Sequence, residues 1–526
     1  DLDFLMDMKA LNLQNLPYKD LSYNMLREVC NRKYTTETTR YRFNVGLNAK
    51  IWRELVFDTK FQYEKNVADT RQYDNEETDY VRQMVNYYTD YDLSGDVLKN
   101  QYIPSGGIIR SSKNSNENYV WRNQLSYNET FGKHDVTALA GMEISEYKTS
   151  GTTYPYVVGY NEKTNTSLPA YYGSKESAKT IVGYPDYYNT LATIVQTTYS
   201  DRVDRYFSYF ANAAYMFDGR YGASFSIRAD GSNYVTDDKS LRWSPMWSAG
   251  LKWNMSNESF LEAASSWVDR LTLRLTYGIN GNVDQSSTTY FIVKQKTQSN
   301  PIKTTYLTYE DDDLPNPKLR WEKTATYNIG LDFRLFNNVI SGSLEYYNRQ
   351  SSDLLVSRYM DPTMGAKSRK VNNGEMRNRG VELSLTANIV RKKDWNFAVD
   401  FNFDYNKNKM LKVDHSDADN VSSFIKSPQD YFMEGTSYNT LWAYRIGRIE
   451  NGYPVAMDKD GNDLVKFNED GTVASITSNS SLKGTDDLVN LGSLTPKFSG
   501  SLAFRLNYKN FDLNAFFVYA GGNKLR

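Results

Sequence analysis

The chain is dominated by runs in which apolar and polar residues alternate with a period of two. In "LTLRLTYGIN", residues 271–280, the odd positions are Leu, Leu, Leu, Tyr and Ile, and the even positions are polar or glycine. A β-strand produces this period because successive side chains project from opposite faces of the pleated backbone. The pattern therefore predicts an all-β chain whose strands have one apolar face and one polar face.

The alternating runs come in pairs separated by tight-turn residues, which predicts antiparallel hairpins. One pair, 207–217 and 221–229, is separated by the Asp-Gly turn at 218–219, where glycine accepts the positive φ that the turn requires. Together with two less regular stretches, 118–131 and 135–147, the runs predict about fourteen strands.

The lengths of the connections decide between a soluble sheet and a membrane barrel. The turns after alternate strands are short: "WRE", "GKH", "DG", "FNN", "RKKD" and "KN". The remaining connections are long, at roughly 66–117, 148–203, 280–321, 350–378 and 406–496. In an up-and-down sheet alternate connections lie at opposite ends, so short turns gather at one end and long loops at the other. Membrane barrels show this asymmetry, with short periplasmic turns and long extracellular loops. One exception, 256–269, is too long for a tight turn and is expected to form a helical piece at the short-turn end.

The polar faces carry long charged side chains that a narrow barrel could not hold, whereas a wide barrel lines water with them. They are Arg228, Lys252, Arg274, Asp332, Arg334, Glu382, Asp400, Asp404 and Arg505. We therefore predict a transmembrane antiparallel up-and-down β-barrel in the cell outer membrane, with its apolar face against lipid.

Composition agrees with this prediction and excludes some alternatives. The 526 residues carry 62 basic and 63 acidic side chains, a net charge of −1, which gives no electrostatic footprint for nucleic acid. The mean hydropathy is −0.66, and no apolar run reaches the length of about 18 residues that a transmembrane helix needs. Aromatic residues make up 14%, which suits the girdles of a barrel; composition alone would also fit a tyrosine-rich soluble β-sandwich. Cys30 is the single cysteine, so the chain holds no internal disulfide.

Several longer stretches resemble the SusC/RagA-type TonB-dependent outer-membrane transporters. They are "LRWSPMWSAGLKWNMSNESFLEAASSWVDRLTLRLTYGINGN" (241–282), "LPNPKLRWEKTATYNIGLDFRLFNNVISGSLEYYNRQSSDLL" (314–355), "VNNGEMRNRGVELSL" (371–385), "MEGTSYNTLWAYR" (433–445) and "LTPKFSGSLAFRLNYKNFDLNAFFVYAGGNK" (494–524). Their order and approximate spacing match the family. The resemblance is strong over 204–526 and weaker over 35–150.

The resemblance implies a barrel of about 22 strands plugged by an N-terminal domain. Residues 1–526 are then expected to form part of one TonB-dependent receptor β-barrel domain, with the plug domain and the C-terminal strands outside this chain. It further implies import of a nutrient, an oligosaccharide or an oligopeptide, without a required cofactor and without enzymatic activity. The implied partners are a SusD-like surface lipoprotein that acts as a lid and the TonB–ExbB–ExbD motor, and transporter–lipoprotein pairs can themselves dimerise.

Two other functions stay open at this point. One is a surface adhesin or structural outer-membrane barrel that binds partner proteins through its long loops, and a weaker one is a siderophore receptor. An enzyme is the least favoured class, because His134 and His415 pair with no Ser or Cys nucleophile at a recognisable spacing. His134 is expected to be a solvated turn residue.

One acidic loop, "DKDGNDLVKFNE" (458–469), is a candidate calcium site. Asp458, Asp460, Asn462 and Glu469 fall at positions 1, 3, 5 and 12 of an EF-hand-like loop, and carboxylate and amide oxygens suit Ca²⁺. Position 6 is Asp463 in place of the usual glycine. The alternative is a solvated acidic hairpin.

Tyrosine-rich segments of the long connection 148–203 are the candidate substrate or partner contacts. Tyr171, Tyr172, Tyr187 and Tyr188 form two adjacent pairs among polar neighbours. Flat rings beside hydrogen-bonding groups suit sugar faces and peptide side chains. The alternative is that these rings pack loop against loop or against a partner protein.

Overall fold

The computed structural model describes residues 16–20, 22–92, 97–169, 197–233, 235, 242–283, 294–297, 305–308, 316–361, 363, 368–413, 421–428, 431, 433–476 and 485–525. The chain forms two compact units. The first unit comprises Asp1–Gly46, Lys60–Trp121 and Ile144–Arg205, and the second comprises Leu47–Thr59, Arg122–Glu143 and Tyr206–Arg526.

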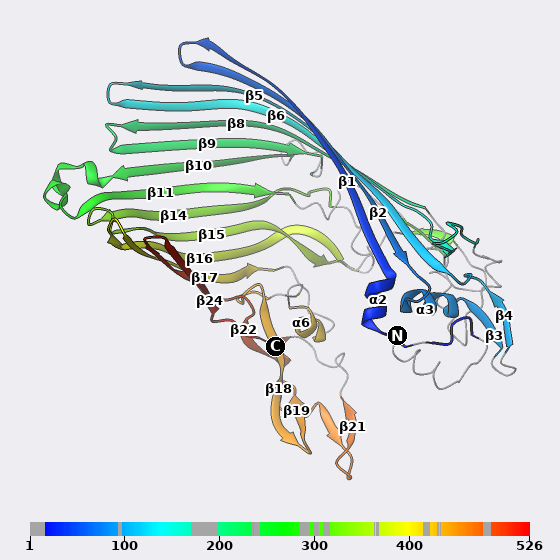
Figure 1. Cartoon of the computed structure of the whole chain (residues 1–526). Helices are drawn as coiled ribbons and strands as arrows, with labels where there is room; N and C mark the ends of the chain where they lie inside the picture. Colours follow the sequence, from blue (N-terminus) through cyan, green and yellow to red (C-terminus); the bar gives the residue numbers. More distant parts are fainter. Residues whose placement is uncertain are drawn as a thin grey trace. The chain divides into compact units, whose positions relative to one another are not determined.

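Long antiparallel strands build one sheet in which hydrogen-bonded neighbours follow chain order (Figure 1). The order is β1-β2-β5-β6-β8-β9-β10-β11-β14-β15-β16-β17-β23-β24, and the short strand β7 pairs β5. The strands are β1 (Arg32–Trp52), β2 (Leu55–Asp74), β5 (Gly107–Phe131), β6 (His134–Thr153), β7 (Val157–Tyr160), β8 (Thr198–Phe217), β9 (Tyr221–Ser232), β10 (Trp243–Asn254), β11 (Val268–Asn282), β14 (Glu322–Leu335), β15 (Ile340–Tyr359), β16 (Ser368–Arg391), β17 (Trp395–Lys412), β23 (Phe498–Tyr508) and β24 (Phe511–Gly521). The up-and-down order and the predicted strand number are confirmed for the described residues.

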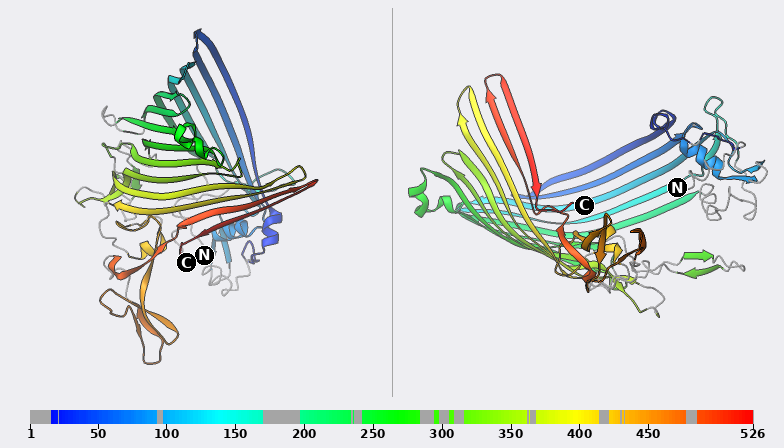
Figure 2. Two further views of the ribbon diagram at one scale, coloured as in Figure 1. Left: turned by 90° about the vertical axis from the view of Figure 1, so that its left-hand side faces the viewer. Right: turned by 90° about the horizontal axis from the view of Figure 1, so that it is seen from below.

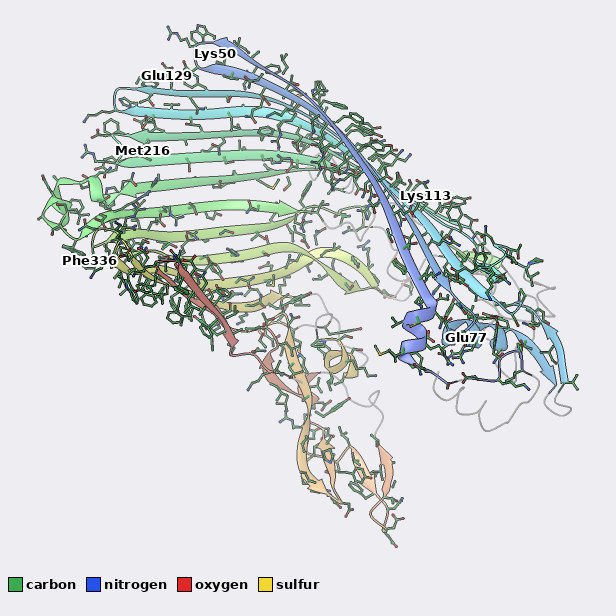
Figure 3. All side chains as sticks on the ribbon, in the orientation of Figure 1. Lys50, Glu77, Lys113, Glu129, Met216 and Phe336 are labelled. Atoms are coloured by element: carbon green, nitrogen blue, oxygen red, sulfur yellow. The ribbon has the colours of Figure 1, made fainter. Side chains whose placement is uncertain are left out.

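Short turns and long connections alternate along the sheet, as the sequence predicts. Figure 3 labels Lys50, Glu129, Met216 and Phe336 near the short turns of four hairpins in the second unit. The segment between β10 and β11 contains the 3₁₀ helices η2 (Met255–Asn257) and η3 (Ser259–Ala264), which confirms the helical piece expected at this end.

One predicted long connection, 350–378, is wrong. β15 extends to Tyr359 and β16 starts at Ser368, so most of the segment is strand. The ladder between them shifts register between Ser351 and Leu354. Because a bulge inserts residues without a partner, it disrupts the period of two on which the prediction depends.

Register keeps the two faces of the sheet separate over several strands. Leu275 of β11 lies opposite Leu251 of β10 and Ile329 of β14, and all three belong to the apolar face. Arg274 lies opposite Lys252 and Gly330 on the polar face. Since the side-chain period is two, a slip of one residue would exchange the faces, and the apolar stripe therefore fixes the register.

The tight turns have the backbone that their sequences predict. Asp218 has φ of 54° and Gly219 has φ of 63°, the left-handed region that a two-residue hairpin turn requires at both central positions. No helix among the described residues is long and apolar enough to cross a membrane.

The first unit has its own small apolar core beside the sheet strands. It contains α2 (Met25–Asn31), α3 (Asp79–Tyr87), β3 (Thr89–Asp92) and β4 (Val97–Gln101). The buried residues that form this core are Val81, Val85, Tyr88, Tyr102, Ile103, Ile108 and Val158. Thr78 caps α3, accepting a hydrogen bond from the Val81 amide, which satisfies one of the free amides of the first turn.

The second unit carries an ordered module in the connection between β17 and β23, which we call the β18–β22 module. It contains α6 (Ser422–Lys426), β18 (Thr440–Glu450), β19 (Tyr453–Met457), β20 (Val465–Phe467), β21 (Val473–Ile476), η7 (Thr485–Asp487) and β22 (Leu488–Ser493). A further short hairpin, β12 (Lys294–Thr297) with β13 (Thr305–Thr308), belongs to the connection after β11. Two views show the tip of the β18–β22 module projecting away from β14–β17 (Figures 1 and 2).

Candidate functional site

The polar face of β11, β14 and β15 holds a network centred on Arg274. Its guanidinium donates to both carboxylate oxygens of Asp332 at 2.8 Å and to Glu345 Oε1 at 2.7 Å. Asn328 Nδ2 donates to the other oxygen of Glu345 at 3.0 Å. The three charged side chains are 25–35% exposed. Water therefore reaches this network.

A second network on the polar face joins β5, β6, β8 and β9. Arg228 Nε donates to Asp230 Oδ1 at 2.7 Å, and its Nη2 donates to Ser208 Oγ at 2.8 Å. Glu143 lies 3.5 Å from Arg228 Nη2 and accepts from Arg122 Nε at 2.7 Å. Cations and carboxylates thus alternate across neighbouring strands.

A third network links β16, β17 and β23. Arg505 Nη2 donates to Asp400 Oδ1 at 2.8 Å, and Thr386 Oγ1 donates to the same oxygen at 2.8 Å. Paired charges of this kind produce a hydrated face with little net charge, which suits a water-filled passage.

A polar pocket of about 580 Å³ lies where β17 extends beyond the start of its partner strand β23. β23 begins at Phe498, opposite Tyr405, and beyond this point residues of the segments 435–440 and 490–497 line the pocket beside β17. Met410 N donates to Thr436 O at 2.8 Å, and Asn406 N donates to Lys497 O at 2.9 Å. The pocket is therefore bounded by backbone contacts of β17 with the segment before β18 and with the segment after β22.

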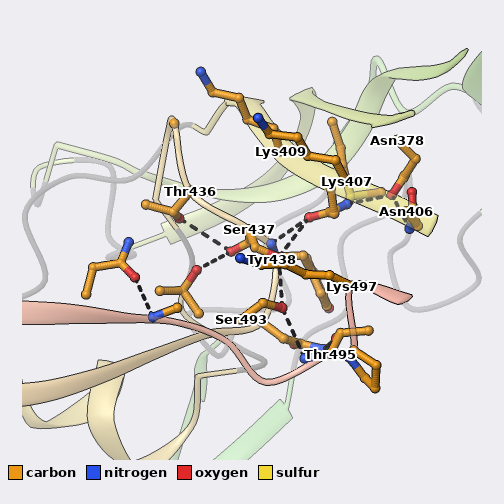
Figure 4. A pocket seen from close by; sticks show the side chains of 18 of the residues that line it. Asn378, Asn406, Lys407, Lys409, Thr436, Ser437, Tyr438, Ser493, Thr495 and Lys497 are labelled. Carbon is orange, nitrogen blue, oxygen red and sulfur yellow. Dashed lines mark hydrogen bonds between the residues drawn. The ribbon is translucent and has the colours of Figure 1, made fainter. Parts of the chain in front are cut away.

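Asparagine amides and Ser, Thr and Tyr hydroxyls together make up most of the lining of this pocket, which we call the amide-rich pocket (Figure 4). Asn408 Nδ2 donates to Asn378 Oδ1 at 2.9 Å, and Asn408 Oδ1 accepts from the Tyr438 amide at 2.7 Å. The side-chain oxygens of Asn406 and Asn439 are buried without a hydrogen-bond partner. Unsatisfied buried acceptors leave hydrogen-bonding capacity for a ligand or water, so the pocket suits a hydroxyl- or amide-rich molecule.

The pocket residues are the part of the site that the sequence did not single out. Asn378, Asn406 and Asn408 lie near the loop ends of β16 and β17 in the Asn-rich segments "NNGEMRN" (372–378) and "NKNK" (406–409). Asparagine-rich strand ends were the available signal. Their convergence depends on the register of two strands and on a connection that returns to β17.

The four predicted calcium ligands are only partly brought together. Asp458 Oδ1 accepts from the amides of Asp460 at 2.9 Å and Asn462 at 2.8 Å, and Asn462 Nδ2 donates to Asp458 Oδ2 at 2.9 Å. Glu469 lies in the turn between β20 and β21. The hydrogen bonds from Asn462 hold the pKa of Asp458 below its usual value. In the part of the chain that the structure describes, no group of three or more His, Cys, Asp or Glu side chains is placed to hold a metal ion. Calcium in this loop stays a prediction.

Replacing Asp458 by alanine is expected to remove one bound Ca²⁺ per molecule, because this carboxylate would supply the first ligand of the loop. Equilibrium dialysis of the full-length protein measures the stoichiometry. Asp470→Ala is the matched control, since Asp470 Oδ1 accepts from the Thr472 amide at 2.9 Å in a similar turn. An unchanged stoichiometry in Asp458→Ala would rule out this calcium site.

The remaining predicted residues are placed as follows. Tyr171, Tyr172, Tyr187, Tyr188 and His415 lie outside the described residues. His134 is half-buried, and its Nδ1 lies 2.8 Å from the Tyr215 hydroxyl. The Phe217 ring also packs against the His134 ring, at a centroid distance of 5.2 Å. The prediction that His134 is a solvated turn residue is therefore wrong.

The sequence profile of the family described as "TonB dependent receptor-like, beta-barrel" matches residues 20–525. TonB-dependent receptor P3 of Formosa agariphila is 25% identical over 434 residues, which cover 80% of this chain and 40% of the relative. TonB-dependent receptor SusC of Bacteroides thetaiotaomicron is 30% identical over 332 residues, 61% of this chain and 31% of the relative. The solved structure of the RagAB peptide transporter has a similar fold, with a TM-score of 0.70 and 22% identity over 94% of this chain and 49% of that chain.

The alternating sheet, its paired charges and its segregated connections define a transmembrane β-barrel with one lipid-facing and one water-facing side. The chain belongs to the TonB-dependent receptor β-barrel family. The proteins of this family are outer-membrane transporters and not enzymes. The chain spans between about a third and two fifths of the length of the curated relatives.

Proposed function

We propose that the full-length protein imports an oligosaccharide or an oligopeptide across the outer membrane with energy delivered through TonB. The observation that supports this function most directly is the water-facing side of a family barrel lined by ion pairs, such as Arg274 with Asp332. Paired charges hydrate a passage without trapping a charged solute strongly. External energy is required because the outer membrane holds neither ATP nor an ion gradient.

The proposed partners follow from the two ends of the strands. A SusD-like lipoprotein would cover the long-loop end as a lid, and TonB–ExbB–ExbD would act from the periplasmic side. The similarity to RagAB, a peptide transporter by its title, supports a lipoprotein partner and an oligopeptide substrate. The similarity to SusC supports the same partner type.

We propose that the amide-rich pocket is one contact for the imported molecule. Its asparagine and serine side chains match the hydroxyls of a sugar or the backbone amides of a peptide equally well. Tyr171, Tyr172, Tyr187 and Tyr188 remain proposed contacts for the substrate or the lid.

We also propose that these residues form part of one larger barrel domain that is completed by further strands and by a plug domain. Support comes from RagAB, of whose matched chain this chain covers 49%. Within the described sheet, β1 and β24 each have one hydrogen-bonded neighbour, and barrels avoid free edges by closure.

Growth of the native host on single nutrient classes tests the import proposal. Deleting the gene is expected to abolish growth on one class of oligosaccharide or oligopeptide, and the full-length gene should restore it. The double variant Asn406→Ala/Asn439→Ala removes the two unpartnered side-chain oxygens. It should reduce uptake about tenfold at limiting substrate, as expected for the loss of two ligand hydrogen bonds. The same assay measures uptake by a variant in which Tyr171, Tyr172, Tyr187 and Tyr188 are all replaced by alanine.

Asn402→Ala is the matched control, because Asn402 lies on β17 and binds Ser501 but does not line this pocket. Equal uptake by the control and the pocket variant would remove the pocket from the substrate path. Normal growth of the deletion strain on every oligosaccharide and oligopeptide would contradict import. Loss of protein-partner binding would then favour an adhesin, and a defect under iron limitation would favour a siderophore receptor.

A further inference from the structure

Two like-charged cross-strand pairs occupy the apolar-face positions at the loop ends of β16 and β17. Arg379 lies directly opposite Lys407, and Arg377 lies directly opposite Lys409. We call these residues the four-cation block. Like charges directly opposite each other destabilise a sheet. Packing within the sheet therefore gives no reason for this arrangement.

No carboxylate in the neighbouring positions compensates the four-cation block. On the adjacent strand β15, Asn348 lies opposite Arg379 and Gln350 lies opposite Arg377. Asn348 Oδ1 accepts a hydrogen bond from Arg379 Nε at 3.2 Å. Within the described part of the chain, none of the four cations forms an ion pair, whereas Arg274 and Arg505 on the polar face are paired with Asp332 and Asp400. The block thus presents basic groups flanked by amides.

The next acidic residue along β16 already has a basic neighbour. Glu375 lies opposite Lys412, and Lys412 Nζ donates to Asn373 Oδ1 at 2.7 Å. This outer row pairs one acidic residue with one basic residue and is balanced in charge.

The block begins where the apolar membrane band of the hairpin ends. On β17 the positions with the parity of Lys407 read Trp395, Phe397, Val399, Phe401, Phe403 and Tyr405 before the first lysine. A rise of about 3.3 Å per residue and a strand tilt of about 40° make the span from Trp395 to Tyr405 about 25 Å thick. That is the height of the apolar band of an outer-membrane barrel. Lys407 and Arg379 therefore lie at the level of the lipid headgroups.

Among the anionic groups of lipid headgroups, phosphate fits the side chains of the four-cation block best. Guanidinium forks bind phosphate oxygens through two parallel hydrogen bonds, and lysines add mobile point charges. Arg379, Lys407 and Lys409 are exposed, and Arg377 is half-buried. Phe401 and Phe403 below them offer an apolar surface for acyl chains, which a soluble anion does not need.

We propose that the four-cation block binds the phosphate-bearing headgroup of an outer-leaflet amphiphile whose acyl chains lie along the apolar face of β16 and β17. Lys407 and Lys409 also line the edge of the amide-rich pocket (Figure 4). A bound headgroup therefore neutralises the end of β17 from which the β18–β22 module departs. This site depends on the membrane position of the barrel and not on the import function.

Lipid binding to the purified full-length protein in detergent tests the proposal by native mass spectrometry. The probes are diphosphorylated lipid A, the same lipid after enzymatic dephosphorylation, and inorganic phosphate alone. The wild type is expected to bind the phosphorylated lipid, and Lys407→Gln/Lys409→Gln should bind it at least about tenfold more weakly, because each headgroup-level cation adds to the attraction. Arg377→Gln/Arg379→Gln should have an effect at least as large.

Lys392→Gln/Lys393→Gln is the matched control, since this exposed lysine pair lies in the turn at the other end of the same hairpin. The control is expected to bind lipid like the wild type. Equal binding of phosphorylated and dephosphorylated lipid by the wild type would overturn the proposal, as would unchanged binding by the Lys407/Lys409 variant. Displacement of the lipid by inorganic phosphate at equal concentration would overturn the assignment to a lipid, because the acyl chains would then contribute nothing.

Discussion

Phe424→Ala is expected to unfold the β18–β22 module while the strands of the sheet stay intact. Phe424 is 4% exposed, and its ring packs against Trp442 and Tyr431 at centroid distances of 6.2 Å and 5.5 Å. The buried cluster around Phe424 is small and is formed by Val421, Phe424, Ile425, Trp442, Leu464 and Leu488. Truncating a buried phenylalanine costs about 3–5 kcal/mol, and a core of this size has few other contacts to compensate the loss.

Hydrogen exchange of the full-length protein in detergent measures this effect. The amides of β18 and β22 should lose protection, and those of β16 and β17 should keep it. Ile449→Ala is the matched control, because Ile449 belongs to the same module but is 77% exposed and should change stability by less than about 0.5 kcal/mol. Full protection of β18 in Phe424→Ala would show that the module does not depend on this core.

Gly380→Ala is expected to destabilise the sheet around β16 by about 1–3 kcal/mol, the usual cost of inserting an atom into a filled site. A Cβ on residue 380 would clash with the Tyr347 hydroxyl oxygen and with the Tyr405 carbonyl oxygen. Tyr347 lies opposite Gly380 on the neighbouring strand and is 5% exposed. The ring covers the glycine, so neither the ring nor the backbone can move away without a loss of contacts.

Unfolding of the purified protein in detergent, followed by tryptophan fluorescence, gives the change in midpoint. Gly231→Ala serves as the control, because its added Cβ would meet the Trp243 ring at an ordinary 3.5 Å. We expect the midpoint to fall for Gly380→Ala and to stay near the wild-type value for Gly231→Ala. Equal midpoints would show that a Cβ on residue 380 does not disturb the packing of the Tyr347 ring.

The sequence predicted local strand structure well because the barrel pattern is local. The stripe of Leu273 and Leu275, and the turn at Asp218 and Gly219, depend on neighbours one to three positions away. Where a bulge interrupts the period, as near Leu354, the prediction of a long connection at 350–378 is wrong. The prediction that the remaining long connections follow alternate strands is confirmed, because it depends on strand order and not on exact strand ends.

The pairing of charges on the polar face could not be predicted from single strands. The alternation placed Arg274 and Asp332 on the polar face, but it did not show that Arg274 also contacts Glu345 of β15. That contact requires the registers of two ladders together. The pocket at Asn378, Asn406 and Asn408 required still more, because the connection after β17 returns to line it.

By itself the sequence determined the all-β class, the apolar and polar faces, the hairpin turns and the end at which long connections lie, since each follows from side-chain alternation and turn chemistry. Only the tertiary structure decided which charges pair, that residues 421–493 contain a separate small core, and that Arg377, Arg379, Lys407 and Lys409 form one block. The reason is that these features join residues of different strands, and cross-strand neighbours are set by register, which no single strand contains.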